Sequence, residues 1–376
     1  MPNNTSLITV EAVANGHPDK IADQIADSVL DAVLQQDPKG RVACEVFLKN
    51  SLIIVGGEIT TSAWVDIESL VKRQLKEIGY CQTNFGLDCS NCTVINMIGR
   101  QSPDIAQSVL GDKICAGDQG IVYGYACKEN DLYMPVPTSL AQELMRRHYQ
   151  VRREGIIPFL GPDAKCQLTF SYQGDQPKHL ECLIFSSQHL SGISPQEIRE
   201  AIMEEIIKKK IPSQYLTSAT KIKINPSGRF IIGGPIGDTG LSGRKIIVDS
   251  YGGFCHHGGG AFSGKDPTKV DRSGAYMARF LAKNLVAAGW AERCEVAIAF
   301  SIGLPDPVAI SLRTFGTGIE TDRELIDKLK KNFDVSVAGI IERFQLQRPI
   351  YLPTATFGHF GRPDINLPWE KIDRIQ

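Results

Sequence analysis

The chain has 376 residues, of which 42% are hydrophobic and 22% are charged. This composition is typical of a folded globular protein, and the length exceeds what one hydrophobic core usually serves, so we expect two or three subdomains. The 41 basic and 42 acidic residues nearly cancel, leaving a formal net charge of -1. Such a balance gives no global attraction to nucleic acid or to an anionic membrane.

The amino-terminal segment lacks the basic and apolar regions of a signal peptide, and no run approaches the roughly 18 apolar residues of a spanning helix. We therefore expect a cytoplasmic protein. The ten cysteines are scattered, many in apolar strand-like segments, which suits reduced thiols better than a disulfide framework. Cys89 and Cys92 form a pair without the second half of a zinc site, so a metal role is not expected for them.

An amphipathic helix is predicted from Pro18 onward, because Ile21, Ile25 and Val29 recur at helical spacing and proline suits a first helical turn. Four aspartates recur on another face of this helix, at positions 19, 23, 27 and 31. A row of this kind is usually solvated surface, and we expect that for all of its members except Asp19.

The rest of the chain alternates strand pairs with helices, which indicates several layers of sheets packed beneath helices. Strands are predicted at 42–48, 51–60, 93–99, 166–172, 179–185, 230–234, 245–250, 295–303 and 308–315. Helices are predicted at 62–79, 135–154, 194–210, 271–288, 321–333 and 336–347. The Gly/Asp-rich stretch at 101–120 has no clear periodicity, and we expect it to be a mobile loop over a site.

The segment 225–269 is the longest glycine-dense region of the chain. Glycine lets backbone N–H groups turn toward a phosphate, and basic residues supply the balancing charge. Five cations lie among these glycines, at Arg229, Arg244, Lys245, Lys265 and Lys269. Simple turn chemistry would explain the glycines alone, but the added cations favour a polyphosphate site.

Part of this segment resembles a P-loop, since Gly259 is followed after four residues by Gly264 and Lys265. However, Asp266 occupies the position where serine or threonine would hold Mg²⁺, and the tight strand–loop–helix context is missing. A P-loop NTPase or phosphotransferase remains only an alternative.

Four further residues carry candidate chemistry. His17 and Asp19 begin the first helix, where an N-terminus attracts phosphate, and they suggest a Mg²⁺-triphosphate corner, although His17 could also be only an N-cap. Glu45 and Glu58 are acidic residues within apolar segments of the sequence. Burying an unpaired carboxylate is costly, so each is expected to have a cation, a metal or a substrate amine as its partner, unless it forms a structural salt bridge.

Taken together, these segments resemble the S-adenosylmethionine synthase (methionine adenosyltransferase) family, in its bacterial form. The resemblance runs through nearly the whole chain, and its most specific motifs are GHPDK, AGDQG, GRFIIGGPIGDTGLSGRKIIVD and HGGGAFSGKDPTKVDRS. It implies synthesis of S-adenosylmethionine from ATP and L-methionine: the sulfur attacks C5′ of ATP and displaces triphosphate, which is then hydrolysed to pyrophosphate and phosphate. An inactive nucleotide-binding regulatory homologue is the remaining alternative.

The resemblance also implies roles for residues at matching positions, with two Mg²⁺ ions per site and one K⁺. The catalytic set is His17, Lys165, Arg244, Lys245 and Lys265. The ATP-binding set adds Asp163, Arg229, Phe230, Asp238 and Ala261, with Phe230 stacking on adenine. The methionine-binding set is Glu58, Gln101, Asp118, Asp238 and Lys269. The metal ligands are Asp19 and Asp271 for Mg²⁺ and Glu45 for K⁺.

The implied fold is α+β, with three similar subdomains related by pseudo-threefold symmetry. The expected subdomains are 1–102, 115–231 and 232–376, with strands that interleave between them. The implied assembly is a homodimer or homotetramer with its active site between subunits, without nucleic-acid or membrane partners. The chain departs from the common family motif at Ala12, Ala14 and Asn15, and its 101–117 loop is shorter. The resemblance does not imply what effect these changes have.

Overall fold

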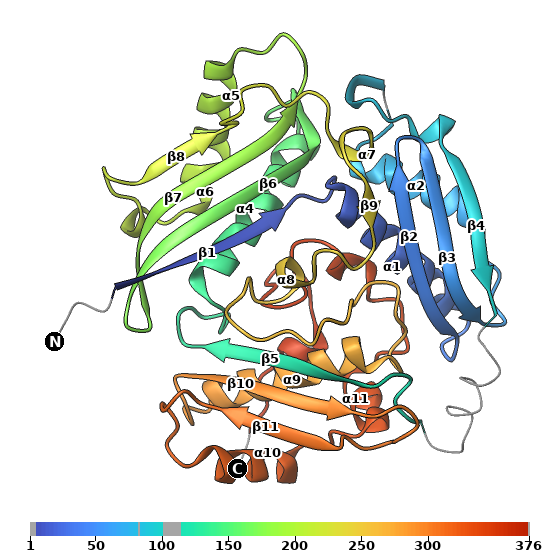
Figure 1. Cartoon of the computed structure of the whole chain (residues 1–376), viewed down its shortest axis with the longest axis vertical. Helices are drawn as coiled ribbons and strands as arrows, with labels where there is room; N and C mark the ends of the chain where they lie inside the picture. The colour runs from blue at the N-terminus through green and yellow to red at the C-terminus, as the bar shows by residue number, and fades with distance from the viewer. Residues whose placement is uncertain (1–4, 82, 101–113, 375–376) are drawn as a thin grey trace.

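The computed structural model describes residues 5–81, 83–100 and 114–374. Three mixed sheet-and-helix units surround a common centre, which agrees with the expected α+β arrangement (Figure 1). Their sheets have the strand orders β1-β6-β7-β8, β4-β3-β2-β9 and β11-β10-β5. One long helix belongs to each unit: α1 (Pro18–Gln36), α4 (Val136–Arg153) and α9 (Val270–Ala287).

The strands are β1 (Thr5–Val13), β2 (Arg41–Lys49), β3 (Leu52–Thr60), β4 (Thr93–Gly99), β5 (Gly120–Cys127), β6 (Leu160–Gln173), β7 (Gln176–His189), β8 (Lys221–Ile224), β9 (Gly240–Leu241), β10 (Arg293–Phe300) and β11 (Ala309–Arg313). The remaining α-helices are α2 (Ile67–Ile78), α5 (Pro195–Ile202), α6 (Lys208–Lys210), α7 (Gly234–Gly237), α8 (Ile246–Asp249), α10 (Asp322–Asn332) and α11 (Val337–Phe344). A π-helical turn, Met203–Ile207, joins α5 to α6, and short 3₁₀ turns lie in the connections.

Each sheet is completed by a strand from a different third of the chain (Figure 1). Strand β1 pairs with β6 along its whole length, from Thr5 opposite Gln173 to Val13 opposite Lys165. Strand β5 pairs with β10, and the short β9 pairs with β2. The amino-terminal, central and carboxy-terminal thirds therefore exchange strands in a cycle, so a cut between thirds removes a strand from a neighbouring sheet.

Two predicted strands are wrong. Residues 245–250 form the short helix α8 and its flanks, because Asp249 turns inward to meet Lys20. Residues 230–234 run irregularly into α7. The other predicted strands and helices are confirmed with shifted ends, and the predicted pair at 166–172 and 179–185 belongs to a longer antiparallel hairpin, β6-β7.

The hydrophobic core lies mainly where helices cover the sheets. One cluster joins α1, α2 and α9 to the amino- and carboxy-terminal sheets, and a second lies between α4 and the central sheet. Within the described part of the chain, no helix is long and apolar enough to cross a membrane.

Candidate active site

The first group of predicted site residues lies where β1 leads into α1, at a position that we call the phosphate corner. His17 caps the helix: its Nδ1 accepts a hydrogen bond from the backbone N–H of Asp19 at 3.2 Å. Gly16 is required here, because a Cβ would lie 2.3 Å from the Cβ of Pro162. Burial, with Lys245 and Lys165 nearby, lowers the pKa of His17 to about 4, although Asp19 opposes the shift. The ring is therefore neutral at physiological pH.

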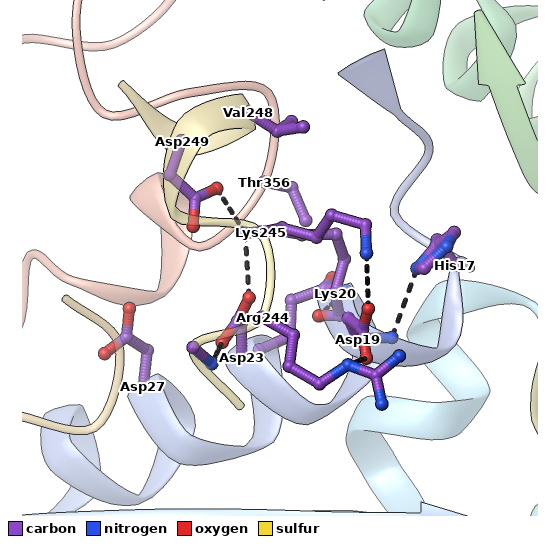
Figure 2. A network of polar contacts seen from close by, with 12 residues as sticks. His17, Asp19, Lys20, Asp23, Asp27, Arg244, Lys245, Val248, Asp249 and Thr356 are labelled. Atoms are coloured by element: carbon purple, nitrogen blue, oxygen red, sulfur yellow. Dashed lines mark hydrogen bonds and ion pairs between the residues drawn. The ribbon is translucent and has the colours of Figure 1, made fainter. Parts of the chain in front are cut away.

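Asp19, one of the buried residues of α1, joins this helix to the segment 241–245 (Figure 2). Its Oδ2 lies 2.6 Å from the Nζ of Lys245, and its Oδ1 lies 3.2 Å from the Nε of Arg244. The same Oδ1 accepts the backbone N–H of Leu241 at 3.0 Å. A carboxylate and two cations thus lie beside a neutral histidine at a helix N-terminus, where anions are stabilised.

The expected solvation of the aspartate row is wrong. Asp23 and Asp27 are buried, and Asp31 is mostly covered. Each accepts backbone N–H groups from a distant segment: Asp23 from Gly243, Asp27 from Gly264, and Asp31 from residues 351 and 352. These donors satisfy the carboxylates away from water. The row therefore fastens the glycine-rich segments to α1.

A buried ion network lies behind the corner (Figure 2). The Nζ of Lys20 is 2.9 Å from Asp23 and 2.5 Å from Asp249. Burial alone would lower the pKa of Lys20, but Asp23 and Asp249 raise it above its ordinary value. Burial raises the pKa of Asp249 to about 7, although Lys20 opposes this. The network holds α8, and with it Lys245, against α1. The sequence interpretation missed this role of Lys20, although an aspartate three residues later was a signal for it.

The glycine-rich segment near Lys265 contradicts the P-loop alternative. Asp266 is fully buried and accepts hydrogen bonds from the backbone N–H of Val42 at 2.7 Å and from the Nζ of Lys269 at 2.5 Å. The N–H of Gly264 donates to Asp27, and its carbonyl accepts from Cys44. These backbone groups are fixed to β2 and α1, so they cannot wrap a phosphate. Lys265 remains, with its Nζ 2.5 Å from Asp271.

A wall of residues from the central unit faces this corner. Asp163 accepts the backbone N–H of Gly234 at 2.8 Å, and burial raises its pKa to about 6, with contributions from Asp238 and Asp19. Gly233 separates Asp163 from Phe230: a Cβ there would lie 2.8 Å from the phenyl ring and 3.2 Å from the carboxylate. The wall thus combines a buried acid with an aromatic ring.

Comparison with known families covers almost the whole chain. Residues 5–103 match the S-adenosylmethionine synthetase N-terminal domain, residues 113–230 match its central domain, and residues 232–371 match its C-terminal domain. The chain belongs to the S-adenosylmethionine synthetase family. It is a methionine adenosyltransferase, which makes S-adenosylmethionine from ATP and methionine. Metal ions are used by this family.

Within this synthetase, several predicted residues do lie together. The pKa of His17 responds to Lys165, Lys245, Asp19 and Asp238, which places these charges around its ring. Lys165 projects from β6 and pairs with Glu11 of β1 at 2.7 Å. Glu11 was not identified from the sequence, because its pairing depends on the long-range contact between β1 and β6.

Other predicted residues have different neighbours. Arg229 is exposed and lines a separate cavity of about 460 Å³ beside α5. Ala261 packs on Gly243, where an added Cβ would lie 2.5 Å away. Asp118 accepts the N–H of Gln119, and Lys269 is held by Asp266. Gln101 falls outside the described residues.

Glu45 and Glu58 are not buried, contrary to expectation. Both are exposed and line a groove of about 420 Å³ on the outer face of β2 and β3. They lie on this face because alternate residues of β2, such as Val46, point into the core instead. Glu58 pairs with Ala43, which bridges to Lys265, so this acid lies one strand away from the lysine.

Proposed function

We propose that His17, Lys165, Arg244, Lys245 and Lys265 stabilise a triphosphate that departs intact from C5′ of ATP. The methionine sulfur donates an electron pair to C5′, and the C5′–O bond breaks with its electrons going to the triphosphate. Sulfur is already a good nucleophile, so alignment and neutralisation of the leaving group are the main tasks. The observation that carries this proposal is the corner where Arg244 and Lys245 meet Asp19 beside His17.

The hydrogen bonding of His17 supports a definite role. Since Nδ1 accepts the N–H of Asp19 and the ring is neutral, the proton belongs on Nε2. Nε2 is therefore a donor that can reach a developing charge without first gaining a proton. Helix N-terminal N–H groups lie beside it, and together they form an anion-stabilising set.

The carboxylates of Asp19, at the start of α1, and of Asp271, at the start of α9, fit Mg²⁺ held jointly by protein and phosphates. Asp19 and Asp271 each hold a lysine: Lys245 and Lys265, respectively. No group of three or more metal-ligating side chains occurs among the described residues. Mg²⁺ commonly uses one or two carboxylates together with substrate phosphates, so this donor set suits it. Mg²⁺ would supply charge neutralisation, and the two lysines would then turn to phosphate oxygens.

The remaining assignments are part of the same proposal. Phe230 stacks on adenine, with Asp163, Arg229, Asp238 and Ala261 as further ATP contacts. Methionine is held by Glu58, Gln101, Asp118, Asp238 and Lys269, and the exposed Glu45 holds K⁺. The triphosphate is hydrolysed to pyrophosphate and phosphate before it is released.

We also propose that the protein is cytoplasmic and forms a homodimer or homotetramer whose subunits share the active site. The outer face of the β4-β3-β2 sheet supports this assembly, because Phe47, Ile95 and Met97 are exposed on these strands. The groove with Glu45 and Glu58 lies on the same sheet. A second copy covering this face would bury the apolar side chains and close the groove.

The test is a product assay with ATP, methionine, Mg²⁺ and K⁺. We expect S-adenosylmethionine together with pyrophosphate and phosphate. Omission of methionine or Mg²⁺ is the matched control and should abolish S-adenosylmethionine formation. ADP as the nucleotide product would indicate a phosphotransferase, and nucleotide binding without any product would indicate an inactive regulatory homologue; either result contradicts the proposal.

A further inference from the structure

A cavity of about 380 Å³ lies among α1, α2, α4 and the 352–364 segment. We call it the three-domain cavity, because all three thirds of the chain contribute to its wall. Its volume is within the range of small-molecule sites. None of the residues assigned above to ATP, methionine or metal lines it.

The wall of this cavity has unused hydrogen-bonding capacity. Gln24 and Gln74 are buried, and Gln74 Oε1 accepts a hydrogen bond from Ser28 at 3.1 Å. The Nε2 of Gln74, however, reaches the Oε1 of Gln24 only at 3.5 Å, which is at the limit of a hydrogen bond. The Nε of Arg146 is buried and has no hydrogen-bond partner among the described residues. Buried polar groups of this kind are normally satisfied, so the wall favours an occupant that can donate and accept hydrogen bonds.

The charges of the wall are already balanced. Arg146 pairs with Glu143 at 2.5 Å and with Asp364, and Arg362 pairs with Asp364 through two hydrogen bonds of 2.8 and 2.7 Å. Glu77 adds a further carboxylate to the lining. A polyanion such as a nucleoside triphosphate would therefore meet as much negative as positive charge, and an uncharged occupant is favoured.

Two aromatic rings line the wall. The rings of Tyr149 and Phe357 lie 6.0 Å apart, with an interplanar angle of 47°, and both line the cavity. Gln150 and Asn15 add side-chain amides. Aromatic faces stack on heterocycles, and asparagine or glutamine amides match the donor and acceptor edge of adenine. We propose that the three-domain cavity is a second, non-catalytic ligand site that takes an uncharged purine nucleoside, of which adenosine is the simplest.

This site would be connected to the phosphate corner. The Nε2 of Gln24 donates to the backbone carbonyl of Asn15 at 2.7 Å and to that of Lys20 at 2.8 Å. Asn15 lines the cavity and precedes His17 by two residues. A nucleoside that contacts Asn15 or Gln24 therefore acts on the back of the turn that positions His17.

The experiment is equilibrium dialysis of labelled adenosine against the intact protein, with the active site saturated by Mg²⁺ and a non-hydrolysable ATP analogue. Methionine is left out, because its sulfur would otherwise displace the phosphate chain of the analogue from C5′. We expect one adenosine per chain, and no competition from further ATP analogue. Gln150→Trp, which fills the cavity, should weaken adenosine binding by about tenfold or more. Gln196→Trp, on the exposed surface of α5, is the matched control and should bind as the parent does.

Three outcomes would overturn the proposal: no adenosine bound at about 1 mM, binding abolished by the active-site ligands, or equal binding by the parent and Gln150→Trp. Tyr149→Leu, which removes the stacking ring, provides an independent weakening if Gln150→Trp does not fold. Lys265→Ala should keep adenosine binding while losing turnover, so failure at this site can be distinguished from failure of the proposed mechanism.

Discussion

His17→Asn separates the two roles that His17 combines. The imidazole caps α1 by accepting the N–H of Asp19 at 3.2 Å, and the proposed mechanism uses its Nε2–H as a donor to the leaving triphosphate. Asparagine is a strong N-cap residue and can accept the same hydrogen bond. It cannot place a donor where Nε2 lies, so the substitution keeps the cap and removes the catalytic donor.

The magnitudes follow from these two contacts. Because the cap is kept, we expect the free energy of unfolding to change by less than about 0.5 kcal/mol. Loss of one donor to a developing charge lowers kcat by about 10² to 10³, or roughly 2.7–4 kcal/mol. His17→Ala loses the cap as well and should cost a further ~0.5–2 kcal/mol of stability. Thermal melting measures stability, and steady-state formation of S-adenosylmethionine at saturating substrates measures kcat.

The acidity of His17 adds a pH dependence with a definite sign. Burial lowers its pKa from 6.5 to about 4, so the fold favours the neutral ring. The resulting stability is present above pH 6.5 and is lost as the pH falls toward 4. His17→Asn should remove this part of the acid dependence. A near-normal kcat in His17→Asn, or a large drop in its melting temperature, would refute the division of roles.

Three further predictions use other parts of the structure. Asp19→Asn removes the charge between Arg244 and Lys245. It should reduce the stabilisation of the transition state by several kcal/mol and lower kcat accordingly in the same assay, whereas near-normal turnover would refute the assignment of Asp19. Asp27→Asn breaks a fully buried ion pair with Arg272 and should destabilise the fold by about 3–5 kcal/mol in denaturant titrations, whereas Glu68→Gln, at an exposed pair, should cost less than about 1 kcal/mol. Phe47→Asp should shift the assembly toward monomers in size-exclusion chromatography, and an unchanged elution volume would argue against an interface on that sheet.

The sequence predicted elements whose signals are local. Helix α1 begins at Pro18 as expected, because its cap and its apolar spacing lie within one segment. The hairpin of β6 and β7 also follows from alternation within its own strands. Residues 245–250 were predicted as a strand because their apolar run is ambiguous, and the buried contact of Asp249 with Lys20 decides the conformation.

The candidate site was predictable in its residue types but not in its pairings. The family resemblance pointed to Asp19, Arg244 and Lys245, yet only the fold brings position 19 beside positions 244 and 245. The aspartate row misled for the same reason, since its backbone donors lie more than 200 residues away along the chain. The solvation of a helix face depends on what packs against it, and that is not a local property.

The cyclic exchange of strands also has a consequence for how the chain reaches its fold. The amino-terminal sheet needs β9 at 240–241, the central sheet needs β1, and the carboxy-terminal sheet needs β5. During synthesis the first sheet therefore presents an open edge until almost two-thirds of the chain has been made. Contacts between residues so far apart in sequence slow folding, and open strand edges invite pairing with other chains. In the complete protein the exchanged strands join the three sheets into one unit. In the nascent chain the edge of the first sheet stays unpaired for most of the time that synthesis takes.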